Sequence, residues 1–298
     1  MLADLTQTKR ERTLNKFDGD FIQYNKKKVK EEGNDLSWFL AIHITLYVLV
    51  VFFAVFFIWF TVFNTTHHFF AVKGASMKST LNSSISNSDG NTSIDAVYVN
   101  TTDKVEIFDV VVINRTNKES IIKRVMGLEG DYVTISKGSY TQNGEPFDTF
   151  FFYRISAEQM KTLDKENFDD EDAKLVEDNN QNGYSIYGYK DWAESNYAEL
   201  AIKYETTFYD TFINGKDTTT DDFFVSKDGL IYVKVPEGKF FALGDNRGHS
   251  SDSTENGFYS VSNIDGVVEI VVYNYNFASR LWEVVKYYFS EAEKFFAR

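Results

Sequence analysis

Ser76 is the residue whose setting most favours nucleophilic chemistry. It lies in the stretch 73–81, directly after Gly74 and Ala75, two small residues that let another backbone approach its hydroxyl. A serine hydroxyl attacks a carbonyl at neutral pH only when a base takes its proton. Lys78 occupies the last position of what would be a Gly-x-Ser-x-Gly elbow, so that motif is excluded. Without a base elsewhere in the chain, the stretch is typical of a polar loop.

The histidines do not suggest a Ser-His-Asp triad with this serine. The chain has four of them: His43, His67, His68 and His249. The first lies inside a long apolar run, and the next two adjoin the end of that run. A buried lysine is the next candidate for the base.

Lys123 interrupts an apolar run, 120–126, that has the pattern of a β-strand. Side chains alternate between the faces of a strand, so Lys123 shares one face with Val125 and Arg124 lies on the other. We expect one of these two cations to point inward or into a cleft. The alternative is a lysine at a sheet edge that extends its amine into solvent.

A second polar segment, 244–254, follows directly after an apolar strand pattern at 239–243. It is dense in small hydrogen-bonding side chains, which can bond neighbouring backbone amides and hold a tight loop. A surface turn needs one or two such residues. This segment has many, among them Asp245, Asn246, Ser250 and Asp252.

Residues 37–63 are apolar and carry no Lys, Arg, Asp or Glu, and a helix needs roughly 20 such residues to cross a bilayer. The run is longer than the apolar region of a cleaved signal peptide, and no Ala-x-Ala site follows it. It therefore predicts an uncleaved transmembrane anchor. Lysines and arginines precede the run in the tail 1–36, which places the amino terminus in the cytoplasm and everything after residue 64 outside.

The composition excludes several classes of function. The net charge of −13 argues against a nucleic-acid partner, which would select a basic face. The chain has no cysteine, so it has neither disulfides nor a thiolate metal site. A carboxylate cluster near residues 166–172 does not follow the spacing of a calcium loop, and a solvated acidic face is the better interpretation.

Several short β-branched or aromatic runs predict a mostly β domain with an inserted mixed α/β subdomain and one amino-terminal transmembrane helix. Phe277 to Arg298 has apolar residues at helical spacing, typical of an amphipathic helix on the membrane or on the domain. The expected divisions are a tail (1–36), an anchor (37–63), a β domain (64–138 and 229–275) that would carry any catalytic site, an acidic insert (139–228) and a carboxyl-terminal amphipathic segment (276–298).

Four segments, in this order, resemble the motifs of type I signal peptidase, the membrane-bound Ser/Lys endopeptidase of bacteria. Residues 74–81, GASMKSTL, resemble the nucleophile motif Gly-x-Ser-Met-x-Pro-Thr-Leu, and residues 109–112, DVVV, resemble the strand that follows it. Residues 123–131, KRVMGLEGD, and residues 244–253, GDNRGHSSDS, resemble the two most specific motifs. The insert matches no family that we can name.

The resemblance implies that Ser76 is the nucleophile, that Lys123 is the general base and that Ser250 orients the Lys123 amine. The Ser76 N–H would donate to the oxyanion. Gly74 occupies a position where some members carry a serine that supplies a second donor. Met77 would pack in the cleft. The loop formed by residues 244–254 would be held by Asp245, Asn246, Arg247 and Asp252.

The implied reaction is the removal of signal peptides from secretory preproteins, with cleavage after small residues at positions −3 and −1. The substrate would add as an extended strand beside the cleft. The resemblance implies a mostly antiparallel β catalytic domain and neither a metal nor a cofactor. It implies a single-pass protein of the plasma membrane, in contact with the lipid bilayer and close to the export translocon.

The chain departs from the family pattern at four positions. Ser79 and Glu129 replace prolines, Phe108 replaces a glycine, and Thr254 replaces an arginine. The last change puts in doubt the ion pair that the resemblance implies for Asp252.

Two other functions fit parts of the pattern. A self-cleaving Ser/Lys repressor would use the same chemistry, but the anchor and the lack of a DNA-binding region argue against it. An inactive binding protein could use the acidic insert to hold a partner, but Ser76 and Lys123 are both present.

Overall fold

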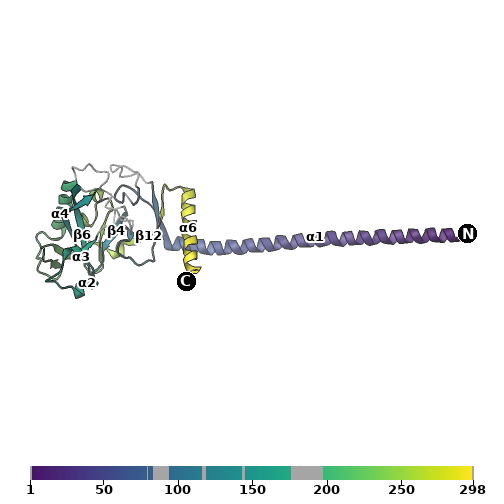
Figure 1. Cartoon of the computed structure of the whole chain (residues 1–298), viewed down its shortest axis with the longest axis horizontal. Coiled ribbons are helices and arrows are strands. Elements are labelled where there is room, and N and C mark those ends of the chain that lie inside the picture. The colour runs from purple at the N-terminus through teal and green to yellow at the C-terminus, as the bar shows by residue number, and fades with distance from the viewer. Residues whose placement is uncertain are drawn as a thin grey trace. The chain divides into compact units, whose positions relative to one another are not determined.

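The computed structural model describes residues 2–296 except 79, 83–93, 116–118, 143–144 and 176–196. Ser79, one departure from the family pattern, therefore lies outside the described residues. The chain divides into two compact units, Met1–Thr65 and Thr66–Arg298 (Figure 1).

The first unit is one helix. α1 runs over Leu2–Thr66, so the predicted boundary between tail and anchor falls inside it. Its segment Ser37–Thr66 has a mean hydropathy of 2.7 and is long and apolar enough to cross a membrane. Leucine, valine and phenylalanine point outward on all sides of this segment, as in a helix that meets lipid rather than a protein core.

The second unit is built on two antiparallel sheets, which confirms the predicted fold class. Among the described residues, the larger sheet has the strand order β1-β2-β12-β3-β4-β10-β11. Its strands are β1 His67–Ala71, β2 Ala96–Asn100, β3 Val110–Ile113, β4 Ile121–Gly127, β10 Lys239–Leu243, β11 Tyr259–Ser260 and β12 Ile264–Val272. These are the β-branched and aromatic runs of the sequence, which suit a pleated surface buried on one or both faces.

The register of the central strands positions the site. β4 lies between β3 and β10, with Lys123 opposite Val111 and Arg124 opposite Leu243. Both cations are buried on opposite faces of the same strand, with 2 % of Lys123 and 5 % of Arg124 exposed. The sequence led us to expect one inward cation. The second is accommodated because it has a carboxylate partner, described below.

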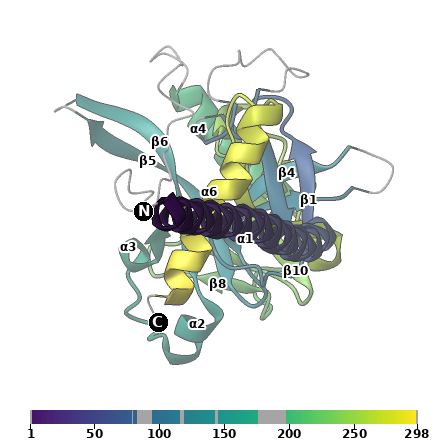
Figure 2. The ribbon, with the colours of Figure 1, turned by 90° about the vertical axis from the view of Figure 1, so that its right-hand side faces the viewer.

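The smaller described sheet has the order β7-β6-β5-β9-β8. Its strands are β5 Tyr132–Gln142, β6 Glu145–Ile155, β7 Lys174–Leu175, β8 Phe223–Val225 and β9 Ile231–Lys234. The β5–β6 hairpin projects from the unit (Figure 2). The short helices are α2 Ala157–Thr162, α3 Asp170–Ala173, α5 Ser253–Asn256 and the 3-10 turns η3 Arg247–His249 and η4 Val261–Asn263.

The described part of the acidic insert is packed into the same compact unit as the catalytic strands. β5 crosses the expected boundary at residue 138 and pairs with β9 beyond the insert. α4, Tyr197–Phe212, buries Phe208 and Phe212 against Phe241 of β10, with ring centroids 6.0 and 5.8 Å apart. The insert is therefore separate in sequence, but its helix forms part of the core under β10.

The last described element is α6, Phe277–Phe296, which packs on β12 (Figure 1). The amphipathic helix expected over 276–298 is present. Val284 is buried on the side that faces the sheet.

Candidate active site

The structure brings Ser76 and Lys123 together. Ser76 lies in a turn between β1 and β2, and Lys123 extends from the middle of β4. The Lys123 Nζ donates to Ser76 Oγ at 3.0 Å and to the carbonyl of Ile122 at 2.9 Å. A hydroxyl and an amine at this separation can pass a proton directly, which is the geometry that a nucleophile and its base require.

Burial makes this lysine a better base than a solvated one. Loss of solvation lowers the pKa of Lys123 from 10.5 to about 8, and the positive charge of Arg115 acts in the same direction. The carboxylates of Asp252 and Asp245 oppose the shift without cancelling it. A solvated lysine is almost wholly protonated at neutral pH, whereas this one has a free-amine fraction that can accept a proton.

Arg124 and Asp245 form a buried ion pair on the opposite face of β4. The guanidinium donates from Nε to Oδ1 at 2.9 Å and from Nη2 to Oδ2 at 2.6 Å. Burial alone would raise the pKa of Asp245, but the hydrogen bonds and charge of Arg124 outweigh it and hold that pKa below its usual range. This bidentate pair ties the loop after β10 to β4 and so fixes that loop relative to Lys123.

Asn246 fastens the same loop to the nucleophile turn. Its backbone N–H donates to the carbonyl of Ser76 at 3.0 Å, and its side-chain Nδ2 donates to the carbonyl of Ala75 at 2.9 Å. Both bonds hold the backbone of the turn and leave the Ser76 hydroxyl to Lys123. None of the backbone hydrogen bonds found in the described part of the chain uses the Ser76 N–H, so this donor is available to a developing oxyanion.

Gly244 lies where the turn that carries Ser76 meets the loop that carries Ser250. A Cβ at this position would lie 2.2 Å from Ser250 Oγ and 2.6 Å from the Ser76 carbonyl oxygen. Only a residue without a side chain lets the Ser76 turn and Ser250 approach so closely.

Ser250 does not form the hydrogen bond to Lys123 that the resemblance implies. Its Oγ is buried beside Gly244 and has no hydrogen-bond partner, while the Lys123 amine uses Ser76 and Ile122. A lysine ammonium carries three donors and the two known bonds use two of them. Ser250 is thus placed next to the pair as an unsatisfied acceptor.

Asp252 is fully buried and receives hydrogen bonds from three directions. Gly244 N–H donates to it at 3.1 Å, and Thr254 donates from its N–H at 3.1 Å and its Oγ1 at 2.9 Å. Thr254, which replaces the family arginine, therefore contacts the carboxylate by hydrogen bonds instead of an ion pair. Asp252 caps α5 and holds Gly244 in place.

The third direction is Tyr204 of α4, a residue that the sequence did not single out. Its hydroxyl lies 3.1 and 3.3 Å from the two carboxylate oxygens of Asp252. Seven residues further along the same face of α4, Thr211 Oγ1 donates to the carbonyl of Thr254 at 2.6 Å. The insert therefore holds the loop that carries Ser250 and Asp252. The only indication of this role in the sequence is the hydroxyl of Tyr204 among the aromatic residues of an amphipathic helix.

Tyr204→Phe is expected to lower kcat/KM by about threefold to tenfold, the effect of one hydrogen bond. Asp252 raises the pKa of Lys123, so its charge acts more strongly when the tyrosine donor is lost. The pH at which activity levels off should therefore move upward. Tyr209→Phe is the matched control, because that half-buried tyrosine of α4 bonds the backbone of Ile231 instead. Equal pH profiles for the two variants would contradict the role of Tyr204.

The other site residues stabilise the turn. Met77 is buried between the sheet and the turn, in a cluster with Val97, Val99 and Ile122. Gly74 adopts φ +75°, a conformation that glycine reaches at low cost and that strains residues with a side chain. Phe108, which replaces a family glycine, adopts the same φ, and its strained backbone is held because its carbonyl accepts from Arg124 Nη1 at 2.8 Å.

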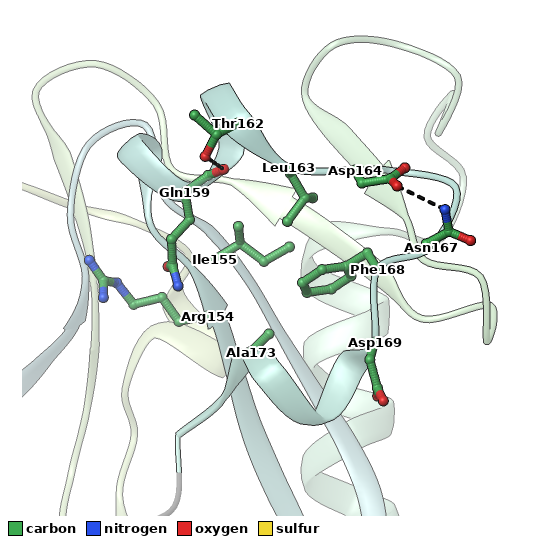
Figure 3. Close-up of a pocket in the computed structure, with 10 residues that line it drawn as sticks. All are labelled: Arg154, Ile155, Gln159, Thr162, Leu163, Asp164, Asn167, Phe168, Asp169 and Ala173. Atoms are coloured by element: carbon green, nitrogen blue, oxygen red, sulfur yellow. Dashed lines mark hydrogen bonds between the residues drawn. The ribbon is translucent and has the colours of Figure 1, made fainter.

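A separate hollow of about 540 Å³ lies beside α2 and α3 and contains none of the predicted site residues (Figure 3). It is lined by Ile155, Leu163 and Phe168 on its apolar side and by Arg154, Gln159 and Asn167 among its polar groups. Among the described residues, no group of three or more His, Asp or Glu side chains is arranged to hold a metal ion.

An antiparallel β unit that presents a serine hydroxyl to a buried amine has the features of a serine hydrolase. The comparison with protein families identifies which one: residues 41–273 match the family described as "Signal peptidase, peptidase S26", and the chain belongs to that family of serine peptidases. Signal peptidases remove signal peptides from preproteins, and its apolar helix is consistent with membrane anchoring.

The other two comparisons add little to this assignment. No curated protein matches the chain. Among solved structures, the crystal structure of a signal peptidase I from Enterococcus faecalis V583 matches with 20 % sequence identity and a TM-score of 0.28. That match covers 56 % of this chain and 98 % of the other.

Proposed function

We propose that the chain is a membrane-anchored Ser/Lys endopeptidase that cleaves secretory preproteins after small residues at −3 and −1. The observation that carries the proposal is the 3.0 Å hydrogen bond between Ser76 Oγ and a lysine whose pKa is lowered to about 8. Neither group would serve alone, since the hydroxyl needs a base and a solvated lysine cannot act as one near neutral pH.

In the proposed reaction, neutral Lys123 takes the proton of Ser76 as Oγ attacks the scissile carbonyl. The Ser76 N–H donates to the oxyanion, and the protonated Lys123 then gives its proton to the leaving amine. The resulting acyl-enzyme is hydrolysed by water with Lys123 again as base. Asp245, Asn246, Arg247 and Asp252 act by holding the loop, and Met77 packs under the turn.

The proposed location follows from the helix Ser37–Thr66. It spans the plasma membrane once, with the tail 1–36 in the cytoplasm and the unit from Thr66 onward outside, because lysines and arginines precede the span. The catalytic unit then begins directly at the outer surface, close to the bilayer and to the export translocon that delivers preproteins.

The test is cleavage of a purified preprotein by the full chain in proteoliposomes. We expect one cut, identified by mass spectrometry of the released mature protein, directly after a small residue at −1. A preprotein with leucine at −1 and another with leucine at −3 are the controls and should resist cleavage. Equal cleavage of all three would contradict the proposed specificity.

Ser250→Ala is expected to lower kcat/KM by about threefold to tenfold if its hydroxyl takes the remaining hydrogen of Lys123 in the substrate complex, because one such bond contributes roughly 0.5–1.5 kcal/mol. Catalytic hydrogen bonds often tighten only when substrate binds. Ser251→Ala, the neighbouring exposed serine, is the control and should leave the rate unchanged. A wild-type rate in Ser250→Ala would exclude the orienting role.

A further inference from the structure

The carboxyl-terminal helix α6 is attached to the catalytic unit by one face. Val284 is buried there, and the Tyr287 hydroxyl donates to the carboxylate of Glu269 in β12. The guanidinium of Arg280 lies 3.9 Å from the centre of the Phe69 ring of β1 and bonds the hydroxyl of Tyr98 in β2 at 3.2 Å. These contacts fix which side of α6 faces the sheet.

The opposite face of α6 is apolar and has no partner among the described residues. Leu281, Trp282 and Phe289 are 57, 61 and 69 % exposed. Together with Val285 they recur at intervals of three, four and seven residues and so lie on one side of the helix. Lys286 and Glu293 border this face and Ser290 lies beyond it. Helices on a soluble surface show the reverse arrangement, with charged residues outward.

The place of α6 in the fold indicates what covers this face. The apolar helix Ser37–Thr66 ends one residue before His67, the first residue of β1. Tyr287 of α6 lies against His67, with ring centroids 6.2 Å apart, and both side chains bond Glu269. α6 is therefore held at the residue where the chain leaves the proposed span, whatever the orientation of the span.

We propose that α6 lies in the membrane interface, with the face formed by Leu281, Trp282, Val285 and Phe289 inserted among the lipids. The proposal rests on the membrane anchoring proposed above and adds a second attachment of the catalytic unit to the bilayer. An interfacial helix of this kind buries its apolar face roughly 5–10 Å deep, and tryptophan favours that depth.

The charges of α6 determine which lipids it needs. Residues 277–296 contain three cations, Arg280, Lys286 and Lys294, and three carboxylates, Glu283, Glu291 and Glu293. The helix therefore has no net charge to attract anionic lipid, and its binding rests on apolar area. Insertion should be the same in zwitterionic and anionic vesicles.

The absence of cysteine from the chain permits a clean test by single-cysteine labelling. The full chain would carry an environment-sensitive fluorophore at Phe289→Cys or at the neighbouring Ser290→Cys, in phosphatidylcholine proteoliposomes with or without nitroxide-labelled lipid. Nitroxide lipid should quench the label at 289 and spare the label at 290, and aqueous iodide should do the opposite. Addition of anionic lipid should change neither result. Preprotein cleavage by each labelled variant verifies that the protein is folded.

A third label, at Phe53→Cys inside the proposed span, separates the two proposals. Quenching at 53 without quenching at 289 overturns the role of α6 and leaves the anchor intact. Failure at 53 overturns the anchor on which both proposals rest. If a second copy covered the face, a pyrene at 289 would form excimers that grow with the protein-to-lipid ratio, and nitroxide lipid would not quench it.

Discussion

Replacing Ser76 by alanine is expected to lower kcat/KM for preprotein cleavage by on the order of 10³-fold or more, and Lys123→Ala should cost nearly as much. The two side chains share one proton at 3.0 Å, so neither retains its function when the other is removed. The double variant should then be no worse than either single variant. The measurement is the rate of appearance of mature protein under single-turnover conditions.

The loss must be separated from a loss of folding. Ser76→Ala removes one oxygen from a half-buried turn, and its circular dichroism and thermal midpoint should match those of the wild type. Lys123→Ala leaves a cavity in a buried position, so Lys123→Met, which fills the space of the stem, is the better second variant.

Lys123→Met also has a stability signature. The folded-state pKa of about 8 lies below the unfolded value of 10.5, so burial of the charged amine is unfavourable below about pH 8 and the stability cost disappears as pH rises through 10.5. Lys123→Met should therefore keep or raise the thermal midpoint at pH 7. Activity above about a tenth of the wild-type rate in folded Ser76→Ala or Lys123→Met would contradict the assignment of nucleophile and base.

Three strands of the larger sheet, β3, β4 and β10, were predictable from sequence because their apolar runs are short and bounded by polar residues. Burial of Lys123 was one of two open alternatives, since an alternating strand pattern says which face a cation shares but not whether that face is covered. Arg124, on the other face, can be buried because it forms an ion pair with Asp245. The two residues are 121 positions apart in the sequence. No local pattern reports such a pairing.

The role of the insert could not be predicted from the sequence, because its contacts also join residues far apart in the chain. The sequence of residues 139–228 predicts a solvated acidic subdomain, because the acidic charge is evident in the sequence. Which of its aromatic residues are buried is not evident there. Phe208 and Phe212 of α4 complete the core under β10, and Tyr204 reaches Asp252 across 48 positions. All three aromatic residues lie on α4, inside the segment that was expected to be a separate insert.

Cleavage by the wild-type enzyme is expected to rise about tenfold per pH unit below pH 7 and to level off above pH 8. In the proposed mechanism Lys123 acts only as the free amine, and with its pKa at about 8 the free-amine fraction is about a tenth at pH 7 and about a hundredth at pH 6. Activity falls toward acid pH because protonation of Lys123 removes the base. The charges of Asp252, Arg115 and Asp245 act on the amine, and burial outweighs the two carboxylates among them.

His249, in the loop 244–254, could imitate this profile, and the direction of its own pKa shift argues against that. Burial, together with the positive charges of Lys78 and Lys203, lowers the pKa of His249 below 6.5. A rise controlled by this histidine would be centred below pH 6.5. The measurement is kcat/KM from pH 5.5 to 9.5 for wild type and His249→Ala, with a preprotein that has no titrating group beside the cleavage site. The rise centred near pH 8 should persist in His249→Ala, and its disappearance there would make histidine the base and overturn the Ser/Lys mechanism.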